Sequence, residues 1–520
     1  MFKLILTFLL TFCLALPTAL ARDFSDVVIL HTNDTHGYLQ NDAEHIGVAA
    51  IKAIKDDYEK AGKTVFLFDA GDFSNGRNLV SFFKGSAAID ALNATGYDAA
   101  TIGNHEFDFG QDVLLANIAK ANFPIISANI IVNATGSNFA PASTIIEKNG
   151  YKLGVIGITT PATITSSNPL YTTGLTFLEG KALYKAVARE VKRLKKQGAE
   201  LIVVLGHLGL EPAVVPNDSH SVIEQVKGID IFLDGHDHQV RNEVVEGTLL
   251  VSTGSHTKNI GRIVFTNGSW QEELIPYGEY TAEDQAVADI VVAAQAKVDE
   301  AYNKVVARSE VDLEGRGDII RTSETNLGDL VADALLWQTK ADCVLTNSGG
   351  IRDSLKAGDI TLGDINTVLP FQNYLCTVKV KGRTILELIE ASTQYTPEKM
   401  GGFPQVAGIQ FTLDTSVPYE KGELYENSNY YQPKNPGSRV TISSIAGQPF
   451  DLDKVYTVGV TDFLLAGGDS YAALRNKENI LAYDYLGYQL NEALLNYLEE
   501  VEGGVIPARY AKSAGRIIIK

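Results

Sequence analysis

The chain has little cysteine, little methionine and no excess of positive charge. Its 520 residues include three cysteines and two methionines, and 63 acidic residues outnumber 44 basic ones, giving a formal net charge of −19. A surface this acidic repels nucleic acid backbones and anionic membranes, so we expect no nucleic acid polymer among its partners. An acidic protein that handles phosphates must concentrate positive charge locally, as bound metal ions do.

The scarcity of cysteine means that the fold does not depend on cross-links. Cys13 lies in the apolar N-terminal run, and the bulky Phe12 before it argues against lipid attachment. Cys343 and Cys376 lie in apolar segments of β type, where a disulfide bond and two buried free thiols are both open.

Long apolar runs are also missing after the N-terminus, so we expect no later membrane span and no membrane anchor. The run over 4–16 is short, is followed by Pro17 and leads to Ala19-Leu20-Ala21, the small-x-small pattern of a signal peptidase site. We predict a signal peptide over 1–21 and a periplasmic or extracellular protein. A noncleaved anchor is the alternative, which the short, interrupted run disfavours.

Short apolar runs alternate with Gly-containing turns and amphipathic helices over residues 26 to about 265. This rhythm predicts an α/β layered domain. A second helix in this region has an outer face rich in Lys and Arg, which we interpret as a solvated surface. The expected strands are 26–30, 64–68, 99–102, 153–158, 201–205, 229–233 and 249–252, and the expected helices are 45–59 and 183–196.

A stretch rich in Ala, Glu, Lys and Val over about 282–306 lacks Gly and Pro and predicts one long helix. We expect it to join a catalytic domain at 22–281, through a linker at 282–310, to a smaller α+β domain at 311–520. In that second domain, helices are expected at 326–339, 384–391 and 489–499. The polar interval 419–438, rich in Tyr and Asn, is expected to be a surface loop.

All nine histidines lie between His31 and His256, which indicates that the first domain uses imidazole for metal ligation or acid/base work. Five clusters of ligand-type residues each follow a predicted strand. Because strand ends on one edge of a sheet converge, we expect the clusters to face a common crevice. Any single cluster is more often a turn than a site, but five together indicate a site. They are HTNDTHG (31–37), DAGD (69–72), GNHEFD (103–108), GHLG (206–209) and DGHDH (234–238).

The ligand types indicate the metals. Carboxylate, imidazole and one carboxamide without thiolate suit Zn²⁺, Mn²⁺, Fe²⁺ or Co²⁺ and argue against iron–sulfur or copper–thiolate sites. About seven ligands exceed what one tetrahedral site takes. We therefore expect two adjacent divalent ions, with Zn or Mn favoured.

The sequence resembles the 5′-nucleotidase family, whose N-terminal domain belongs to the calcineurin-like metallophosphoesterases. The resemblance rests on HTNDTHG, DAGD, GNHEFD, GHLG and GHDH in order, and it continues through RTSETNLGDLVADAL, NSGGIR, LPFQN, GGFPQVAG and FLLAGGDSY. It covers essentially the whole mature chain. It implies a layered α/β/β/α metallophosphoesterase domain joined by a helix to a smaller α+β substrate-binding domain.

The resemblance also implies roles for the residues of the first domain. One ion would be held by Asp34, His36 and His238, the other by Asn104, His207 and His236, and Asp72 would bridge both. His105 would stabilise the transition state or protonate the leaving oxygen, and Asp108 would orient it. The implied nucleophile is a metal-bound hydroxide. The remaining histidines, namely His31, His45, His220 and His256, are interpreted as structural or surface residues.

For the second domain, the resemblance implies that Phe403 and Phe463 stack on a nucleobase and that Asp469 accepts hydrogen bonds from ribose. Arg352 would clamp phosphate oxygens. Asn373 is a weaker candidate, as are Lys356 and Gln405. The family's first stacking aromatic sometimes lies three residues later, where this chain has Val406. Catalysis would need the two domains to close together, with motion in the linker at 282–310.

The function that follows is hydrolysis of nucleoside 5′-monophosphates by an exported two-metal phosphoric monoester hydrolase, with side activity on nucleotide di- or triphosphates or UDP-sugars. One alternative uses the same metals on 2′,3′-cyclic nucleotides or another ester, a sulfur ester included. Another is a non-enzymatic periplasmic binding protein with a decayed site. The complete set of ligand residues speaks against decay. The sequence leaves the oligomeric state open.

Overall fold

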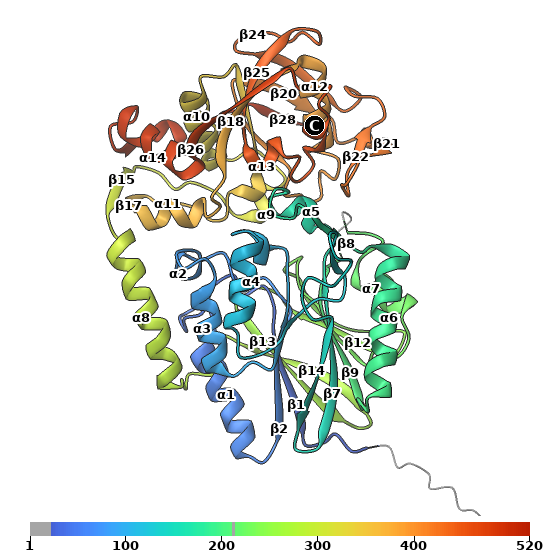
Figure 1. The fold of residues 1–520 in the computed structure, drawn as a ribbon. Coiled ribbons are helices and arrows are strands. Elements are labelled where there is room, and N and C mark those ends of the chain that lie inside the picture. The colour runs from blue at the N-terminus through green and yellow to red at the C-terminus, as the bar shows by residue number, and fades with distance from the viewer. Residues whose placement is uncertain (1–21, 211–213) are drawn as a thin grey trace, which may run out of the picture.

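The computed structural model describes residues 22–210 and 214–520 (Figure 1). The predicted signal peptide at 1–21 therefore lies outside the described residues. Within the two described ranges, every helix is too short or too polar to cross a bilayer.

One six-stranded sheet forms half of the centre of the N-terminal domain. Its strands run in the order β14-β13-β1-β2-β3-β4, with β1 to β4 parallel and β13 and β14 antiparallel. The central strands are buried on both faces, which explains their unbroken apolar sequence. The strands are β1 (Val27–Thr32), β2 (Thr64–Asp69), β3 (Ala99–Thr101), β4 (Ile125–Ile126), β13 (Asn259–Thr266) and β14 (Ser269–Pro276).

A second six-stranded sheet packs face to face against the first. Its order is β11-β12-β10-β9-β7-β6, with β7, β9, β10 and β12 parallel. Apolar side chains from both sheets, such as Phe66 and Val203, form one buried layer between them. The strands are β6 (Ser143–Lys148), β7 (Tyr151–Thr159), β9 (Leu201–His207), β10 (Ile231–Leu233), β11 (Val240–Val245) and β12 (Thr248–Thr253), and β5 (Ile130–Val132) pairs with β8 (Leu175–Phe177) nearby.

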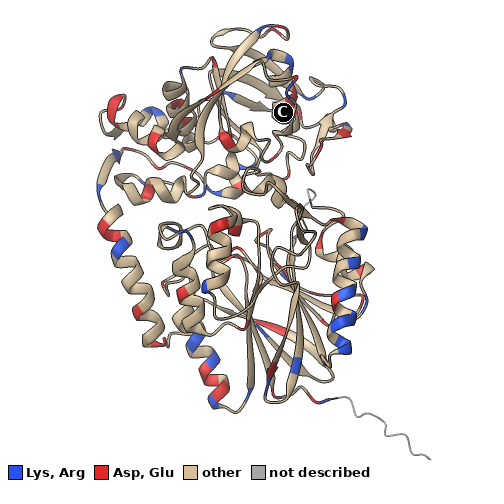
Figure 2. Ribbon diagram, viewed as in Figure 1, with Lys and Arg blue, Asp and Glu red and all other residues tan. Residues whose placement is uncertain are grey.

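Helices cover the outer face of each sheet, which confirms the expected α/β/β/α layers. The first sheet is covered by α1 (Val48–Lys60), α3 (Ser86–Thr95) and α4 (Gln111–Lys120), and the second by α6 (Gly180–Lys196) and α7 (Ser219–Gln225). Figure 2 shows Lys and Arg along the outer side of α6, and Lys185, Arg189 and Lys192 are exposed there. Short helices α2 (Asn78–Ser81) and α5 (Thr163–Ser166) lie in loops at the upper end of the domain.

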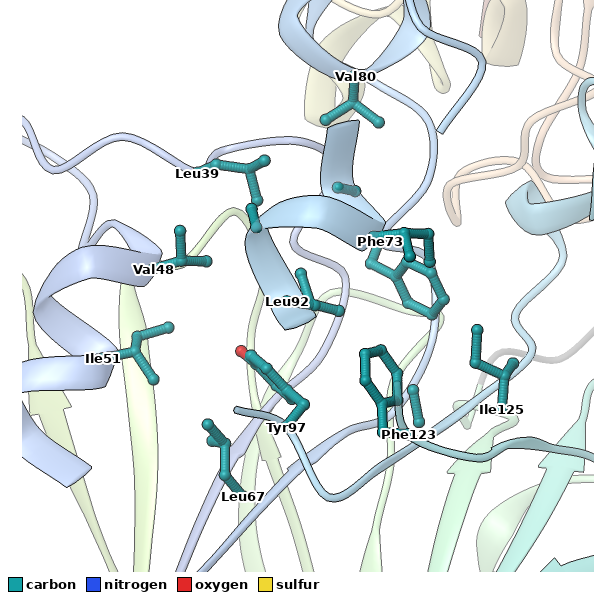
Figure 3. Close-up of a cluster of buried hydrophobic side chains, with 14 of the residues drawn as sticks. Leu39, Val48, Ile51, Leu67, Phe73, Val80, Leu92, Tyr97, Phe123 and Ile125 are labelled. Atoms are coloured by element: carbon teal, nitrogen blue, oxygen red, sulfur yellow. The ribbon is translucent and has the colours of Figure 1, made fainter. Parts of the chain in front are cut away.

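The hydrophobic core beneath the first helix layer is drawn in Figure 3. The side chains of α1 and α3 in this core, Val48, Ile51 and Leu92, point toward two residues on the side of the sheet. These are Leu67 of β2 and Tyr97, which follows α3. These side chains are all at most 5% exposed. The core holds the strands in place, and their carboxyl ends point to the other domain (Figure 1).

The C-terminal domain is built on two larger sheets. A five-stranded sheet has the order β19-β16-β25-β18-β26, and a four-stranded sheet has the order β24-β23-β20-β28. The strands are β16 (Cys343–Asn347), β18 (Tyr374–Lys381), β19 (Pro404–Ala407), β25 (Val455–Thr461) and β26 (Ala482–Gln489), then β20 (Ile409–Leu413), β23 (Val440–Ile445), β24 (Gln448–Pro449) and β28 (Ile517–Ile519).

Smaller sheets and helices complete this α+β domain. A three-stranded sheet contains β15 (Val305–Ser309), β17 (Gly358–Thr361) and β27 (Val505–Ile506). Side chains cap four of the helices. Thr325 and Thr461 accept hydrogen bonds at the starts of α10 and α13, and capping boxes begin α11 at Thr361 and α14 at Gln489. The helices are α9 (Gly317–Ile320), α10 (Asn326–Thr339), α11 (Leu362–Val368), α12 (Gly382–Ala391), α13 (Asp462–Leu465) and α14 (Leu490–Glu500).

The long helix expected between the domains is α8 (Gln285–Tyr302), capped by the Asp284 side chain. It packs against α1 and α3, and Val287 and Val291 belong to the core of the N-terminal domain. The expected helix is too long at its C-terminal end, because residues from Val305 onward form β15 of the C-terminal domain. The chain therefore passes from one domain to the other at residues 303–304.

The interval 419–438 is not a simple loop, and that prediction is wrong. It contains a hairpin of β21 (Lys421–Leu424) and β22 (Tyr431–Pro433). Tyr425 and Tyr430 are buried in the core of the domain. Aromatic side chains anchor a polar segment that composition alone assigns to solvent.

Cys343 in β16 and Cys376 in β18 are both buried and free. Strand β25 lies between their strands in the sheet. The alternative of two buried thiols is therefore the one that the structure supports.

Candidate active site

The seven expected metal ligands lie at the carboxyl ends of five strands, six of them in the loops that follow and His207 as the last residue of β9. The strands are β1, β2 and β3 of the first sheet and β9 and β10 of the second. The expectation of a single sheet edge is therefore wrong. The ends of two stacked sheets supply the residues, and the structure brings all seven together: Asp34, His36, Asp72, Asn104, His207, His236 and His238.

One group of ligand-type atoms is formed by Asp34, His36 and His238, whose potential ligand atoms lie within 4.8 Å of one another. Nε2 of His36 and Nε2 of His238 are 3.1 Å apart. Oδ1 of Asp34 lies 3.5 Å from Nε2 of His238. The Asp34 carboxylate also accepts the backbone N–H of His236 at 3.0 Å, which ties the first and last ligand loops together.

A second group is formed by Asp72, His207 and His236, with the same spacing limit. Oδ2 of Asp72 lies 3.0 Å from Nε2 of His207 and 3.8 Å from Nε2 of His36, which belongs to the first group. Asp72 therefore lies between the two groups, where a shared carboxylate would have to be. Asn104 lines the same cavity.

The donor set fits two divalent cations. Oδ1 of Asn104 is fully buried and has no hydrogen-bond partner among the described residues, and such an orphaned atom is costly unless a ligand uses it. Burial lowers the pKa of His236 to about 4 and that of His36 well below its usual value. These imidazoles are therefore neutral and have a lone pair for a metal.

The backbone at the ligands is unusual. Five of the seven ligand residues have positive φ, with values of 48° at Asp34, 44° at His36, 60° at Asp72, 86° at His236 and 60° at His238. Left-handed turns of this kind are strained for non-glycine residues and gather at functional sites. The neighbouring Gly103 is required as well, because a Cβ there would lie 2.3 Å from Oδ1 of Asp72.

His105 and Asp108 form a pair beside the ligands. Nδ1 of His105 lies 2.6 Å from Oδ2 of Asp108. Burial disfavours the charged imidazole, but the Asp108 and Asp72 carboxylates outweigh burial and raise the pKa of His105. Asn75 donates to Asp108, and Ser167 Oγ donates to the Asn104 carbonyl at 2.5 Å. The pair is thus held in a fixed orientation.

Glu106, which the sequence analysis did not single out, organises two of the ligand loops. Its carboxylate accepts four backbone N–H groups: those of Asp72 at 3.0 Å, Phe73 at 2.9 Å, Ser74 at 3.0 Å and Gly103 at 2.6 Å. Glu106 lies inside the motif GNHEFD, so its position could be noticed in the sequence. A glutamate can, however, be either a metal ligand or a buried hydrogen-bond acceptor, and the sequence does not tell which.

The other four histidines have side-chain or ring partners. His31, His45 and His220 pair with Glu272, Asp42 and Glu243, respectively. The ring of His256 stacks on Tyr38 with centroids 4.4 Å apart and contacts the rings of His36 and His238. His256 thus packs against two ligand residues rather than facing solvent.

Four of the seven expected metal ligands line a cavity between the two domains, namely Asp72, Asn104, His236 and His238. Its walls come from the N-terminal domain on one side and from the C-terminal domain on the other. Four substrate-binding candidates line this cavity together with His105 and Asp108: Arg352, Asn373, Phe463 and Asp469. Backbone contacts cross the gap beside it, since Asp469 N–H donates to the Thr165 carbonyl at 2.7 Å.

Arg352 and Asp469 are the charged candidates from the C-terminal domain. Burial and the nearby Arg321 lower the pKa of Arg352 to about 10, and the group remains cationic at neutral pH. Burial raises the pKa of Asp469 to about 6, against the opposing effect of the Asn347 amide, which donates to it at 2.7 Å. A buried cation facing the metal ligands suits an anionic substrate.

The structure does not support Phe403 as a base-stacking residue. Its side chain is fully buried in the core of the C-terminal domain, at the start of β19, and so is that of Val406. Gln405 is also internal, because its side chain bonds to the backbone of Ser323 and Thr325. Lys356 is exposed and pairs with Asp312. Phe403 and Gln405 of the GGFPQ motif therefore serve packing, whereas its Gly401 lines the cavity.

Several cavity residues were not found from the sequence. They are Tyr171 of the N-terminal domain and Arg321, Phe371, Asn429 and Tyr430 of the C-terminal domain. The ring of Phe371 stacks on that of His105 at 5.7 Å, across the domain boundary. Phe371 lies in the motif LPFQN and Arg321 begins the motif RTSETNLGDLVADAL, but the other three carry no local signal of their own.

Two family models match the chain. The model of calcineurin-like phosphoesterases matches residues 27–240, and the model of the 5′-nucleotidase C-terminal domain matches residues 305–476. Between them they cover the loops of the ligand-type residues and the C-terminal wall of the cavity.

Curated and solved proteins resemble the chain over most of its length. A 5′-nucleotidase of Vibrio cholerae is 31% identical, with 91% of this chain and 90% of that protein covered. Protein UshA of Escherichia coli is 27% identical over 95% of each. The crystal structure of a 5′-nucleotidase precursor from Thermus thermophilus superimposes with a TM-score of 0.79 and 27% identity, covering 95% of this chain and 99% of that one.

Proposed function

Because the chain belongs to the 5′-nucleotidase family and is a phosphoester hydrolase of the calcineurin-like type, we propose that it releases phosphate from nucleoside 5′-monophosphates. The observation that carries this proposal is the cavity that residues from both groups of metal-ligand type line together with Arg352, Phe463 and Asp469 of the other domain. The product pair is a nucleoside and inorganic phosphate.

Two divalent cations fit the N-terminal wall, and the ligand chemistry favours Zn or Mn. Asp34, His36 and His238 would hold one, and Asn104, His207 and His236 the other, with Asp72 shared. When bound, such a pair supplies Lewis acidity toward water and toward the phosphoryl oxygens. The orphaned oxygen of Asn104 and the neutral imidazoles support this assignment.

His105 moves the proton in this scheme. Its Nδ1 is held by Asp108, which leaves Nε2 to face the reacting phosphate. As water adds to phosphorus and the bond from phosphorus to the ribose oxygen breaks, His105 stabilises the developing charge and donates a proton to the leaving oxygen. Asp108 fixes the tautomer and stabilises the imidazolium form.

The C-terminal domain selects the substrate. Arg352 clamps phosphate oxygens, Asn373 lines the path beside it, and Asp469 accepts hydrogen bonds from ribose hydroxyls. Phe463 offers a ring face to the base, a contact that favours nucleotides over plain phosphomonoesters. The same pocket admits nucleotide di- and triphosphates or UDP-sugars as poorer substrates. We also propose export of the protein, supported by the signal-peptide pattern over 1–21.

Phosphate release from AMP, with and without a chelator, tests the proposal. We expect chelation to abolish release and added Zn²⁺ or Mn²⁺ to restore it. Asp72→Asn should lower kcat by about a hundredfold or more and reduce the metal bound per chain, whereas Asp112→Asn, at an exposed position, should leave both unchanged. Hydrolysis of bis-p-nitrophenyl phosphate or cyclic AMP in preference to AMP would favour a different ester as substrate.

A further inference from the structure

The hairpin of β21 and β22 brings its connecting segment, residues 425–430, to the cavity wall. Asn429 and Tyr430 from this segment line the cavity together with Phe463 and Asp469. The segment is internally bonded, since Tyr425 N–H donates to the Tyr430 carbonyl at 3.0 Å. Oη of Tyr425 donates to Glu387 of α12 at 2.7 Å. The tip of the hairpin is therefore held in place rather than free in solvent.

Arg475 connects this tip to the loop that follows Phe463. Its guanidinium donates to the backbone carbonyl of Glu426 at 3.1 Å and to that of Asn427. It also donates to the carbonyls of Ala466 at 3.0 Å and Gly467 at 3.2 Å. One partly buried side chain thus fixes the distance between the hairpin tip and the segment that carries Phe463.

The Asn429 side chain has an unmet hydrogen bond at the cavity wall. Its Nδ2 atom is buried and has no partner among the described residues. A buried amide donor of this kind loses its hydration without compensation unless an acceptor on a ligand reaches it. The side-chain carboxamide of Asn presents an N–H donor next to a carbonyl acceptor. It is therefore best matched by the edge of a nucleobase on which an acceptor nitrogen lies next to an amino group.

We propose that Asn429 reads the edge of the nucleobase and makes the enzyme prefer adenine nucleotides. This inference rests on the proposed function and specifies its substrate. With the base against Phe463, the carboxamide pairs with a ring nitrogen and the neighbouring amino group of adenine, the pairing that Asn commonly makes with this base. Guanine presents an oxygen in place of that amino group, which leaves the Asn429 carbonyl unpaired. Asn429, which contacts the base edge, lies on the hairpin, while Phe463, which stacks on the base, lies on α13.

The test compares kcat/KM for AMP, GMP and ribose 5-phosphate, which lacks a base, in the wild type and in Asn429→Ala, Asn429→Asp and Glu423→Ala. Glu423 is an exposed residue on the same hairpin and serves as the matched control. We expect the wild type to prefer AMP over GMP. Asn429→Ala should lower kcat/KM for AMP about tenfold and bring the AMP-to-GMP ratio closer to one. Asn429→Asp should also lower kcat/KM for AMP, because a carboxylate cannot donate to the adenine ring nitrogen. Ribose 5-phosphate and the control should not change.

Two outcomes would overturn the inference. One is an AMP-to-GMP ratio that the Asn429 substitutions leave unchanged. The other is an equal loss on all three substrates, which indicates a structural role for Asn429. A wild type that hydrolyses none of these nucleotides but cleaves other phosphoesters contradicts the proposed function instead, so the two failures are distinguishable. Melting temperatures of the variants establish that each is folded.

Discussion

At the scale of single residues, the site depends on a strained backbone. Asp34, His36, Asp72, His236 and His238 all have positive φ, at a cost of order 1–3 kcal/mol each. The residue types and order of the ligands were predictable, because Asp, Asn and His after strands form a recognisable pattern. Their positive φ angles could not be predicted, because none of the five residues is glycine and no local sequence preference requires a left-handed backbone there.

The two phenylalanines expected to stack on a base should behave differently when truncated. Phe463→Ala should raise KM for AMP about tenfold, because base stacking is worth about 1–3 kcal/mol, with p-nitrophenyl phosphate hydrolysis unchanged. Phe403→Ala should instead lower the free energy of unfolding by about 3–5 kcal/mol, because it leaves a cavity in the core. Steady-state kinetics and denaturant unfolding measure the two effects. If Phe403→Ala changed KM for AMP alone, our placement of Phe403 in the core would be incorrect.

The titration of Asp469 should make kcat/KM depend on pH for nucleotides but not for substrates without ribose. Burial raises its pKa to about 6, while Asn347, Arg321, Arg352 and His105 oppose the rise. Above pH 6 the carboxylate is ionised and accepts ribose hydroxyls, and below pH 6 it is protonated and this acceptor is lost. The ratio of kcat/KM for AMP to that for p-nitrophenyl phosphate should therefore fall as pH decreases through about 6. The ratio cancels titration of groups that act on both substrates.

Asp469→Asn provides the control for this profile. The variant should give a lower ratio whose remaining variation between pH 5 and 8 comes only from the phosphate groups of the two substrates, because the amide does not titrate. Persistence of the wild-type pH profile in Asp469→Asn would assign the titration to another group.

At the scale of elements, one side chain holds the loops after β2 and β3 in register. Replacing Glu106 by Gln removes one acceptor oxygen and leaves two of four buried N–H groups without a partner. We expect the free energy of unfolding to fall by about 2–4 kcal/mol and the affinity for metal to fall about 10- to 100-fold. Denaturant unfolding and metal titration measure these changes. Glu59→Gln, at an exposed position on α1, should leave both unaltered.

Elements with strong periodicity were predicted well. The helix expected at 326–339 coincides with α10 (Asn326–Thr339), where the Thr325 cap marks the start. The seven strands expected in the first domain all occur, with ends shifted by a few residues. The hairpin within 419–438 was missed because its strands are short and polar. Its buried tyrosines are stabilised by contacts distant in sequence, which no local pattern contains.

At the scale of the whole molecule, the two domains have separate cores. The three buried clusters of the N-terminal domain contain residues no later than Val291, and the two clusters of the C-terminal domain contain none before Ala307. The sequence indicated two domains, and the family resemblance implied two stacked sheets in the first. The apolar runs alone do not give strand order or sheet membership, because these depend on which runs pair. That pairing is not encoded in the runs themselves.

Because the two domains have separate cores and the proposed metal ligands all lie in the N-terminal domain, we expect the domains to unfold separately. Calorimetry should resolve two transitions, and a chelator should lower only the one that belongs to the N-terminal domain. Ligand at a hundredfold excess over Kd stabilises a domain by about 2.7 kcal/mol, so the shift should be about 5–10 °C. The other transition should stay within error. A single transition that moves as a whole with chelator would mean that the domains unfold as one unit.

The division of the cavity walls also bears on how such proteins diverge. The two groups of metal-ligand type both come from the N-terminal domain, and the residues proposed to contact the nucleoside come from the C-terminal domain. After gene duplication, substitutions around the nucleoside can accumulate while hydrolysis of small phosphate esters persists and keeps the copy under selection. A new substrate specificity can therefore evolve through changes in the C-terminal half of the gene, without passing through an inactive enzyme.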